Sequence, residues 1–313
     1  MIAYIDLHCD TLTKIIKEDA PLSLEELPGF HVDLKRLREA GTMAQVFAIW
    51  MGEEKDRDSD RKYIERLVSI FRDSLSDQVR HVQSVSDLEN NADDGILSVI
   101  LSLEDCRIVE SVDDMEWLYS KGVRIFGLIW NYINSLGFPN STDRDVMQRG
   151  LTPLGKEAVE YLNFKGGLID VSHLSDGGFW DVKQISKKPF VATHSNARSI
   201  TDHPRNLTDE MIRALAESGG VAGLNFCLSF LGEDRERNHL EDHLRHLNHL
   251  KKVGGEDIVA IGSDFDGVGG KLVIDEPGKM VLLFEALEKD GWSQRQIEKL
   301  AYGNILRVLR EVW

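Results

Sequence analysis

Eight short apolar segments, most of them separated by segments with helical periodicity, constrain the fold of this chain more than any other feature. Each segment is almost continuously apolar, which is typical of strands in a parallel sheet that is covered on both faces. Eight strand–helix units favour a (β/α)8, TIM-like barrel of the α/β class. The predicted strands are the start of 2–12, then 42–50, 95–103, 123–130, 167–172, 189–193, 220–225 and 257–263.

An open, doubly wound sheet is the alternative architecture. No glycine-rich phosphate loop follows any predicted strand, which argues against the dinucleotide-binding version of that fold. The 313 residues contain no internal repeat and no low-complexity tract, so we expect one domain over 1–313. The predicted helices are 32–40, 58–75, 112–121, 152–165, 176–186, 208–218, 238–253, 277–289, 293–300 and 304–311.

Charge and cysteine content argue against several classes of partner. A net charge of -16 repels phosphate backbones, so no nucleic-acid partner is expected. Three cysteines without a CxxC pair indicate a reducing compartment rather than a disulfide framework. Asp6 interrupts the first apolar run, and no window approaches about 18 uncharged apolar residues, so neither a signal peptide nor a membrane span is predicted. We therefore expect a cytoplasmic protein without a membrane partner.

Residues that bind metals or transfer protons stand at the ends of five predicted strands. In a barrel, the carboxyl ends of the strands carry the active site. Alternation along the first strand places His8 and Asp10 on the same side and Cys9 on the other. The complete set is His8, Asp10, Glu104, His173, His194 and Asp264.

Imidazoles and carboxylates in this set suit zinc or a similar divalent ion. Six groups are too many for one tetrahedral ion with an open position, and they fit two ions that share a ligand. Glu104, central in the set, is the best candidate for the bridge. Two ions about 3.5–4 Å apart can hold a hydroxide and polarise a carbonyl group. Asp264, at the end of the last strand, could return a proton to a leaving amine.

Seven motifs, spread over almost the whole chain, carry a resemblance to a known family. The chain resembles the membrane dipeptidase (renal dipeptidase) family of the amidohydrolase superfamily, whose fold is a TIM-like barrel with a binuclear zinc site. The resemblance implies a dipeptidase that uses a metal-bound hydroxide. The motifs are IDLHCDTL, LSLEDC, GLTPLGKEAVEYLN, LIDVSHLS, ATHSNARSI, HPRNLTDE and IGSDFDG.

The resemblance also implies a role for each matching residue. His8 and Asp10 would bind one zinc, Glu104 would bridge, and His173 and His194 would bind the second zinc. Two further roles follow from the same motifs. Asp264 matches the catalytic aspartate, and Arg205 matches the arginine that holds the C-terminal carboxylate of the substrate, a role that suits a bidentate guanidinium. The family often accepts a D-residue at that position.

One departure from the family pattern concerns the substrate. Several members have a histidine after the fourth strand where this chain has Trp130 followed by Asn131. Trp130 could stack on a substrate, Asn131 could donate a hydrogen bond to it, or Trp130 could be an aromatic residue of the barrel mouth. Asn225, at the end of the seventh strand, either faces the substrate or is structural.

Four further histidines and a second aspartate after the last strand have structural explanations. The four histidines 239, 243, 246 and 249 lie on one helical face and are better explained by packing or solvation than by a second metal site. Asp266 is expected to cap the turn after Asp264.

Two alternative functions stay open from the sequence. One is another amide, lactam or ester hydrolase, and the other is a metal-stabilised binding protein without catalysis. Members of the family are often dimers, but no apolar stripe here identifies a homodimer interface.

Overall fold

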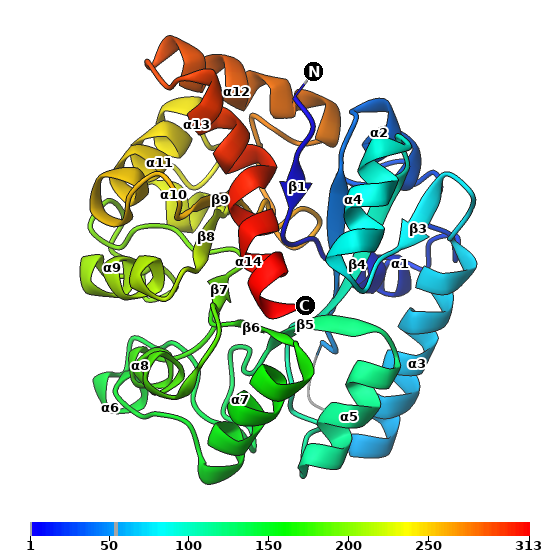
Figure 1. Ribbon diagram of the computed structural model, residues 1–313, viewed down its shortest axis with the longest axis vertical. Coiled ribbons are helices and arrows are strands. Elements are labelled where there is room, and N and C mark those ends of the chain that lie inside the picture. Colours follow the sequence, from blue (N-terminus) through cyan, green and yellow to red (C-terminus); the bar gives the residue numbers. More distant parts are fainter. Residues whose placement is uncertain (1, 53–55) are drawn as a thin grey trace.

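The computed structural model describes residues 2–52 and 56–313, and its centre is a parallel barrel surrounded by helices (Figure 1). The strands follow the order β2-β1-β9-β8-β7-β6-β5-β4-β3, and an additional pairing between β2 and β4 closes eight of them into a ring. The strands are β1 Ile5–Asp6, β2 Ala44–Ile49, β3 Val79–His81, β4 Leu97–Leu103, β5 Val123–Gly127, β6 Leu168–Asp170, β7 Val191–Ala192, β8 Val221–Leu224 and β9 Val259–Ile261.

Every predicted strand contains one strand of the closed barrel, which confirms the TIM-like fold over the open sheet. Strand β3 was not predicted, because its three residues include Arg80 and His81 and so lack an apolar run. It pairs with the start of β4, with Val79 opposite Leu97, and β5 pairs with the end of the same strand. The ninth strand therefore lies outside the ring of eight.

Most of the helices lie around the outside of the barrel, and α14 crosses one end of it (Figure 1). Across the described residues, no helix combines the length and the apolar character needed to cross a membrane. The helices are α1 Thr11–Lys17, α2 Leu34–Glu39, α3 Arg57–Asp73, α4 Val85–Asp93, α5 Val112–Ser120, α6 Arg144–Met147, α7 Pro153–Lys165, α8 Asp176–Ile185, α9 Asp209–Glu217, α10 Leu228–Leu231, α11 Leu240–Gly254, α12 Met280–Lys289, α13 Gln294–Glu298 and α14 Asn304–Val312, with a 3-10 turn at Pro277–Lys279 and a π turn at Lys299–Gly303.

Helix α7 shows how local sequence sets these boundaries. The side chain of Thr152 accepts a hydrogen bond from the backbone N–H of Gly155, and Pro153 occupies the first turn, where its missing N–H costs nothing. Gly166 ends the helix with a φ of 79°, a conformation that a residue with a side chain adopts only at a cost. The helices α1, α4, α6 and α10 were not predicted, and each of them has nine residues or fewer.

One end of the barrel is sealed by the last helix. Apolar residues near the strand starts, such as Ala44, Val191 and Val221, form one buried cluster with the inner face of α14. That face presents Ile305, Leu306, Val308, Leu309 and Val312. Because α14 covers this end with apolar side chains, the opposite end, where the strands finish, is the one expected to receive a ligand.

Candidate metal centre and active site

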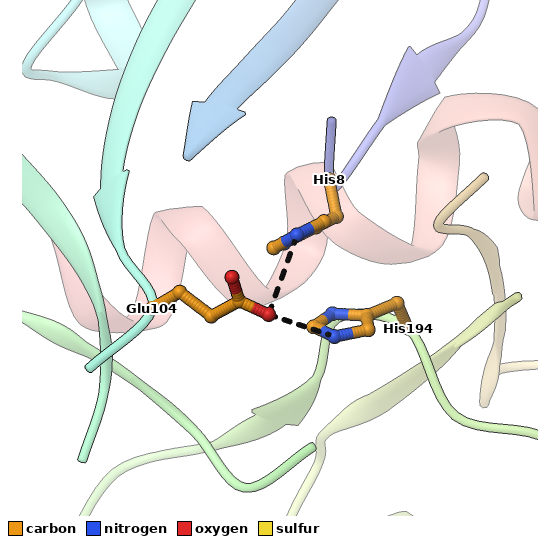
Figure 2. Close-up of side chains that lie close together, drawn as sticks. All are labelled: His8, Glu104 and His194. Carbon is orange, nitrogen blue, oxygen red and sulfur yellow. Dashed lines mark ion pairs between the residues drawn. The ribbon is translucent and has the colours of Figure 1, made fainter. Parts of the chain in front are cut away.

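Three histidines surround the carboxylate of Glu104 at the open end of the barrel. Figure 2 shows His8, Glu104 and His194 pointing toward one another from three separate strand ends. Glu104 Oε1 lies 3.7 Å from His8 Nε2, 3.6 Å from His194 Nε2 and 3.0 Å from His173 Nε2. The four residues come from positions far apart in the sequence, and the strand ends bring them together as predicted.

A second group forms on the other side of His8. His8 Nε2 lies 3.5 Å from Asp10 Oδ2 and 4.0 Å from Asp264 Oδ1. Among the residues that the structure describes, two sets of donor atoms are compact enough for an ion: in each, the atoms lie within 4.8 Å of one another. His8 belongs to both sets, whereas the sequence suggested Glu104 as the shared residue. The two sets are His8, Glu104 and His194, and His8, Asp10 and Asp264.

Orphaned polar atoms show that this cluster fits a divalent ion. Within the described part of the chain, His8 Nε2 and Asp10 Oδ1 are buried and have no hydrogen-bond partner. Buried polar atoms normally have one, so an unpartnered pair at a cluster of donors calls for an explanation. Imidazole nitrogens and carboxylate oxygens are the ligands that zinc-type ions use. The residues present therefore fit a metal site.

The charges of the cluster also favour a cation. Burial lowers the pKa of His173 and of His194 well below the usual value, with the charges of Arg205 and His8 acting in the same direction. These two rings are therefore neutral and keep a lone pair for a ligand bond. Burial alone would lower the pKa of His8, but the carboxylates of Glu104, Asp10 and Asp264 raise it to about 10. Burial raises the pKa of Glu104.

Hydrogen bonds behind the cluster orient two of the rings. His173 Nδ1 lies 2.9 Å from Asn131 Oδ1, and His194 Nδ1 lies 2.7 Å from Thr193 Oγ1. The Thr193 hydroxyl in turn donates to Asp170. With Nδ1–H donated in both rings, each Nε2 carries the lone pair and faces Glu104, which is how hydrogen-bond partners usually orient metal-binding histidines. No pattern along the sequence predicts these contacts.

Asp264 lies beside the cluster in an unusual backbone conformation, with a φ of 62°. Its Oδ2 accepts a hydrogen bond from Asn225 Nδ2 at 2.9 Å, and burial raises the pKa of its carboxyl to about 7. Asn225 is fully buried and also donates to the carbonyl of His194 at 3.2 Å. Asn225 therefore supports Asp264, which matches the structural reading of this residue.

A cavity of about 670 Å³ opens above the cluster, a size suited to a small ligand. Asp10, Glu104, His173 and Asp264 contribute to its lining. Trp50, Lys14 and Lys17 also line the cavity. The sequence does not predict this, because a tryptophan at a strand end and lysines on a helix form no distinctive pattern. Other residues that line the cavity include Trp130, Asn131, His203, Arg205, Cys227 and Phe230.

Trp130 is part of an aromatic group at the wall of this cavity. Its ring centroid lies 4.9 Å from that of Trp50, 5.1 Å from that of Tyr132 and 6.1 Å from that of His173. The position agrees both with a barrel-mouth aromatic residue and with a surface on which a substrate can stack. Asn131, next to it, contacts His173 as described above.

Arg205 reaches into the cluster from the loop before α9. It is 6% exposed, its Nη2 lies 3.0 Å from His173 Nε2, and its Nη1 donates to the carbonyl of Ser172. The guanidinium carbon lies 5.3 Å from the ring centroid of Phe230. This places a fixed positive charge on the cavity lining.

The histidines of α11 do not belong to the cluster. His243 and His246 are fully buried. His246 Nδ1 accepts from the backbone N–H of Ala197 at 3.1 Å, and its Nε2 lies 3.0 Å from the carbonyl of Leu231. Among the described residues, neither compact group of metal ligands includes a histidine of this helix. The packing interpretation is therefore supported.

Comparison with known proteins agrees with this geometry. A family model described as membrane dipeptidase (peptidase family M19) matches residues 1–313. An uncharacterized protein of Klebsiella pneumoniae, from the pqqA 5′ region, is 36% identical over 246 residues, covering 75% of this chain and 90% of that protein. An uncharacterized dipeptidase of Schizosaccharomyces pombe is 29% identical, covering 90% of this chain and 72% of that protein.

Solved structures are similar over the whole chain. A dipeptidase described as a metallopeptidase of family M19 superposes with a TM-score of 0.92 at 28% identity, covering 100% of this chain and 99% of that one. A metallopeptidase of Rhodobacter sphaeroides, liganded with a phosphinate mimic of the dipeptide L-Ala-D-Ala, has a TM-score of 0.91 at 28% identity, with the same coverage. These similarities extend across both the barrel and the strand ends that carry the cluster.

Proposed function

Because the chain belongs to the membrane dipeptidase family, peptidase family M19, and is a metallo-dipeptidase, we propose that it works with two zinc ions at the open end of its barrel. His8 and Asp10 would hold one ion, His173 and His194 the other, and Glu104 would lie between them. The observation that carries this proposal is the convergence of three Nε2 atoms within 3.7 Å of Glu104 Oε1. When bound, the ions would supply an activated water and polarise the scissile carbonyl.

The protein's own groups supply proton transfer. Asp264 is the proposed catalytic residue, because its Oδ1 faces His8 at 4.0 Å while Asn225 holds its other oxygen. A carboxylate fixed in this way can accept a proton from the attacking water and deliver it to the leaving amine. Asn225 is then a positioning residue for Asp264 rather than a direct contact of the substrate.

Substrate recognition is proposed to depend on Arg205. Its guanidinium lines the cavity and can hold the free carboxylate of a dipeptide through two hydrogen bonds. Trp130 is proposed to offer an aromatic wall for the substrate. Asn131 is proposed to act mainly through His173, which it contacts. The dipeptide mimic bound by the Rhodobacter sphaeroides enzyme supports the proposal that a D-residue is accepted at the C-terminal position.

A dipeptide panel with added zinc tests this substrate class directly. We expect hydrolysis of dipeptides such as L-Ala-D-Ala, and no hydrolysis when the C-terminal carboxylate is amidated, because Arg205 then loses its partner. Arg205→Ala is expected to raise KM for free dipeptides while zinc content stays unchanged, and Arg205→Lys is the matched control for charge without bidentate geometry. Equal turnover of free and amidated substrates would favour a general amide or ester hydrolase.

Location, assembly and domain organisation are separate proposals. The three cysteines are free thiols, which is consistent with a reducing, cytoplasmic environment. Cell fractionation tests this location. Size-exclusion chromatography with light scattering tests whether the protein is a homodimer. Limited proteolysis tests the single domain proposed over 1–313, which should resist cleavage into separately folded fragments.

A further inference from the structure

The turn after Asp264 is tied to the segment that carries His8 and Asp10. The backbone N–H of Asp264 donates to the carbonyl of His8 at 3.2 Å, and the N–H of Asp10 donates to the carbonyl of Phe265 at 2.8 Å. Cys9 and Phe265 form an isolated parallel bridge between these bonds. The two segments therefore run side by side at the barrel mouth, and their alignment brings the carboxylates of Asp10 and Asp264 to within 4.0 Å of His8 Nε2.

Asp266 extends this attachment to the first turn of α1, which begins directly after Asp10. The side chain of Asp266 is completely buried. Its Oδ2 accepts from Thr11 Oγ1 at 2.6 Å, and its Oδ1 accepts from Lys14 Nζ at 3.1 Å. The sequence suggested that Asp266 caps its own turn, but these partners lie more than 250 positions away. The carboxylate therefore joins the turn after β9 to the first helix of the chain.

A third segment completes the attachment. Asp266 Oδ1 also accepts from the backbone N–H of His31 at 2.7 Å, and the N–H of Asp266 donates to His31 Nδ1 at 2.9 Å. Asp264 and Asp266 have φ angles of 62° and 67°, in the left-handed region that residues with side chains avoid. Such conformations persist where the surrounding contacts hold them. The bonds to Asp266 are contacts of that kind.

Gly267 shows how closely this turn packs against the two carboxylates. A Cβ atom at this position would lie 2.1 Å from Asp10 Oδ2 and 2.5 Å from Asp264 Oδ1. Both distances are far shorter than any contact between non-bonded atoms. A small movement of the turn therefore changes the room that Asp10 and Asp264 have next to His8.

We propose that Asp266 is a positioning residue, which clamps the 264–267 turn to α1 and thereby sets the spacing of Asp10 and Asp264. This inference rests on the proposed function, since these carboxylates are a proposed metal ligand and the proposed catalytic residue. Asp266 touches neither the substrate nor an ion in this scheme. It acts through the backbone that carries Asp264 and through Thr11, the neighbour of Asp10.

Two substitutions separate the clamp from local backbone strain. Asp266→Asn keeps the shape of the side chain but loses the charge that holds Lys14. Asp266→Gly relieves the left-handed conformation and removes every side-chain bond. If Asp266 mattered only through the strained backbone conformation of its turn, Asp266→Gly would keep the zinc affinity and kcat of the wild type. The clamp predicts that both variants bind zinc about 10–100-fold more weakly, as measured by competition with a chromophoric chelator. At saturating zinc, kcat is expected to fall about 10-fold or more with KM nearly unchanged.

Asp114→Asn is the matched control. Asp114 is also a buried carboxylate with a cationic partner, here Arg57, and it accepts from two backbone N–H groups, but it lies outside the cavity lining. Its loss is expected to lower stability in denaturant without changing zinc affinity or kcat. If the Asp266 variants lose stability as Asp114→Asn does and keep wild-type zinc affinity and kcat, the clamp is wrong.

A further variant keeps the test decisive if the Asp266 variants do not fold. Gly267→Ala changes the same turn from its other side, and its methyl group is expected to displace Asp10 and weaken zinc binding at least about 10-fold. Wild-type zinc affinity in Gly267→Ala would overturn the proposed coupling. If the wild type binds zinc but cleaves no dipeptide, the proposed function fails, while the zinc affinities of these variants still decide whether the clamp exists.

Discussion

The two ends of the barrel are built from the same strands but hold opposite chemistry. At the strand starts, apolar side chains such as Val191 and Val221 pack with α14 in one buried cluster. At the strand ends, histidines and carboxylates crowd together and leave His8 Nε2 without a hydrogen-bond partner among the described residues. The end covered by α14 contributes to the stability of the fold. The open end holds charged groups close together, an arrangement that does not by itself stabilise the folded chain. Substitutions at the two ends should therefore separate activity from stability.

The largest effect is expected for Glu104→Gln at the open end. Gln keeps the shape of the side chain but removes the charge that the three histidines face. Zinc binding should be lost, and dipeptide hydrolysis should fall to the background rate. In the presence of a chelator the free energy of unfolding should not decrease, because burial already raises the pKa of Glu104 and makes its charge costly. A variant that unfolds more easily but retains zinc would contradict this division of roles.

Leu309→Ala tests the sealed end with the reverse expectation. Leu309 is 1% exposed in the cluster formed by α14 and the strand starts. Removing its side chain should lower the free energy of unfolding by about 2–5 kcal/mol, as measured in urea. Zinc content and kcat of the folded enzyme should match the wild type. Loss of zinc without loss of stability would show that the two ends are coupled.

Asn131→Ala tests the hydrogen bond that orients His173, a proposed metal ligand at the open end. The variant frees Nδ1 of His173, so zinc affinity should fall about 10–100-fold. Asn134→Ala is the matched control, since Asn134 lies in the same loop and donates to Asp105 and to the carbonyl of Leu128 instead. Unchanged zinc affinity with a raised KM would assign Asn131 to the substrate rather than to His173.

Histidines outside the open end should make the protein sensitive to acid. Burial lowers the pKa of His81, His243 and His246 to about 4 in each case. The unfolded chain binds these protons near pH 6.5, so stability is complete above that pH and is lost as pH falls toward 4. Each histidine should cost about 2 kcal/mol between pH 7 and pH 5.

Denaturation at the two pH values, with and without His81→Gln, measures this acid sensitivity. His81→Gln should reduce the change in the free energy of unfolding between pH 7 and pH 5 by about 2 kcal/mol, the contribution of one histidine. A free energy of unfolding that stays constant between pH 7 and pH 5 would contradict the expectation.

The contrast between the two ends also explains what the sequence could predict. Each barrel strand is an apolar run, and five of these runs stop at residues of the cluster, so both the strands and the residues at their ends could be predicted. Strand β3 was not, because it depends on pairing with β4 rather than on its own composition. Which donors share a set, and how Asn131 and Thr193 orient the rings, depends on the angles between strand ends. The link from Asp266 to Thr11 joins the turn after β9 to the first helix of the chain, and spacing along a sequence carries no trace of it.

Zinc stoichiometry tests the central claim most directly, namely that side chains from five strand ends meet to hold a pair of ions. The protein should be stripped with a chelator, saturated with zinc, freed of excess by gel filtration and measured by elemental analysis against protein concentration. The account predicts two zinc ions per chain in the wild type and in Leu309→Ala, and none in Glu104→Gln. A wild-type protein that remains folded and retains no zinc would contradict it.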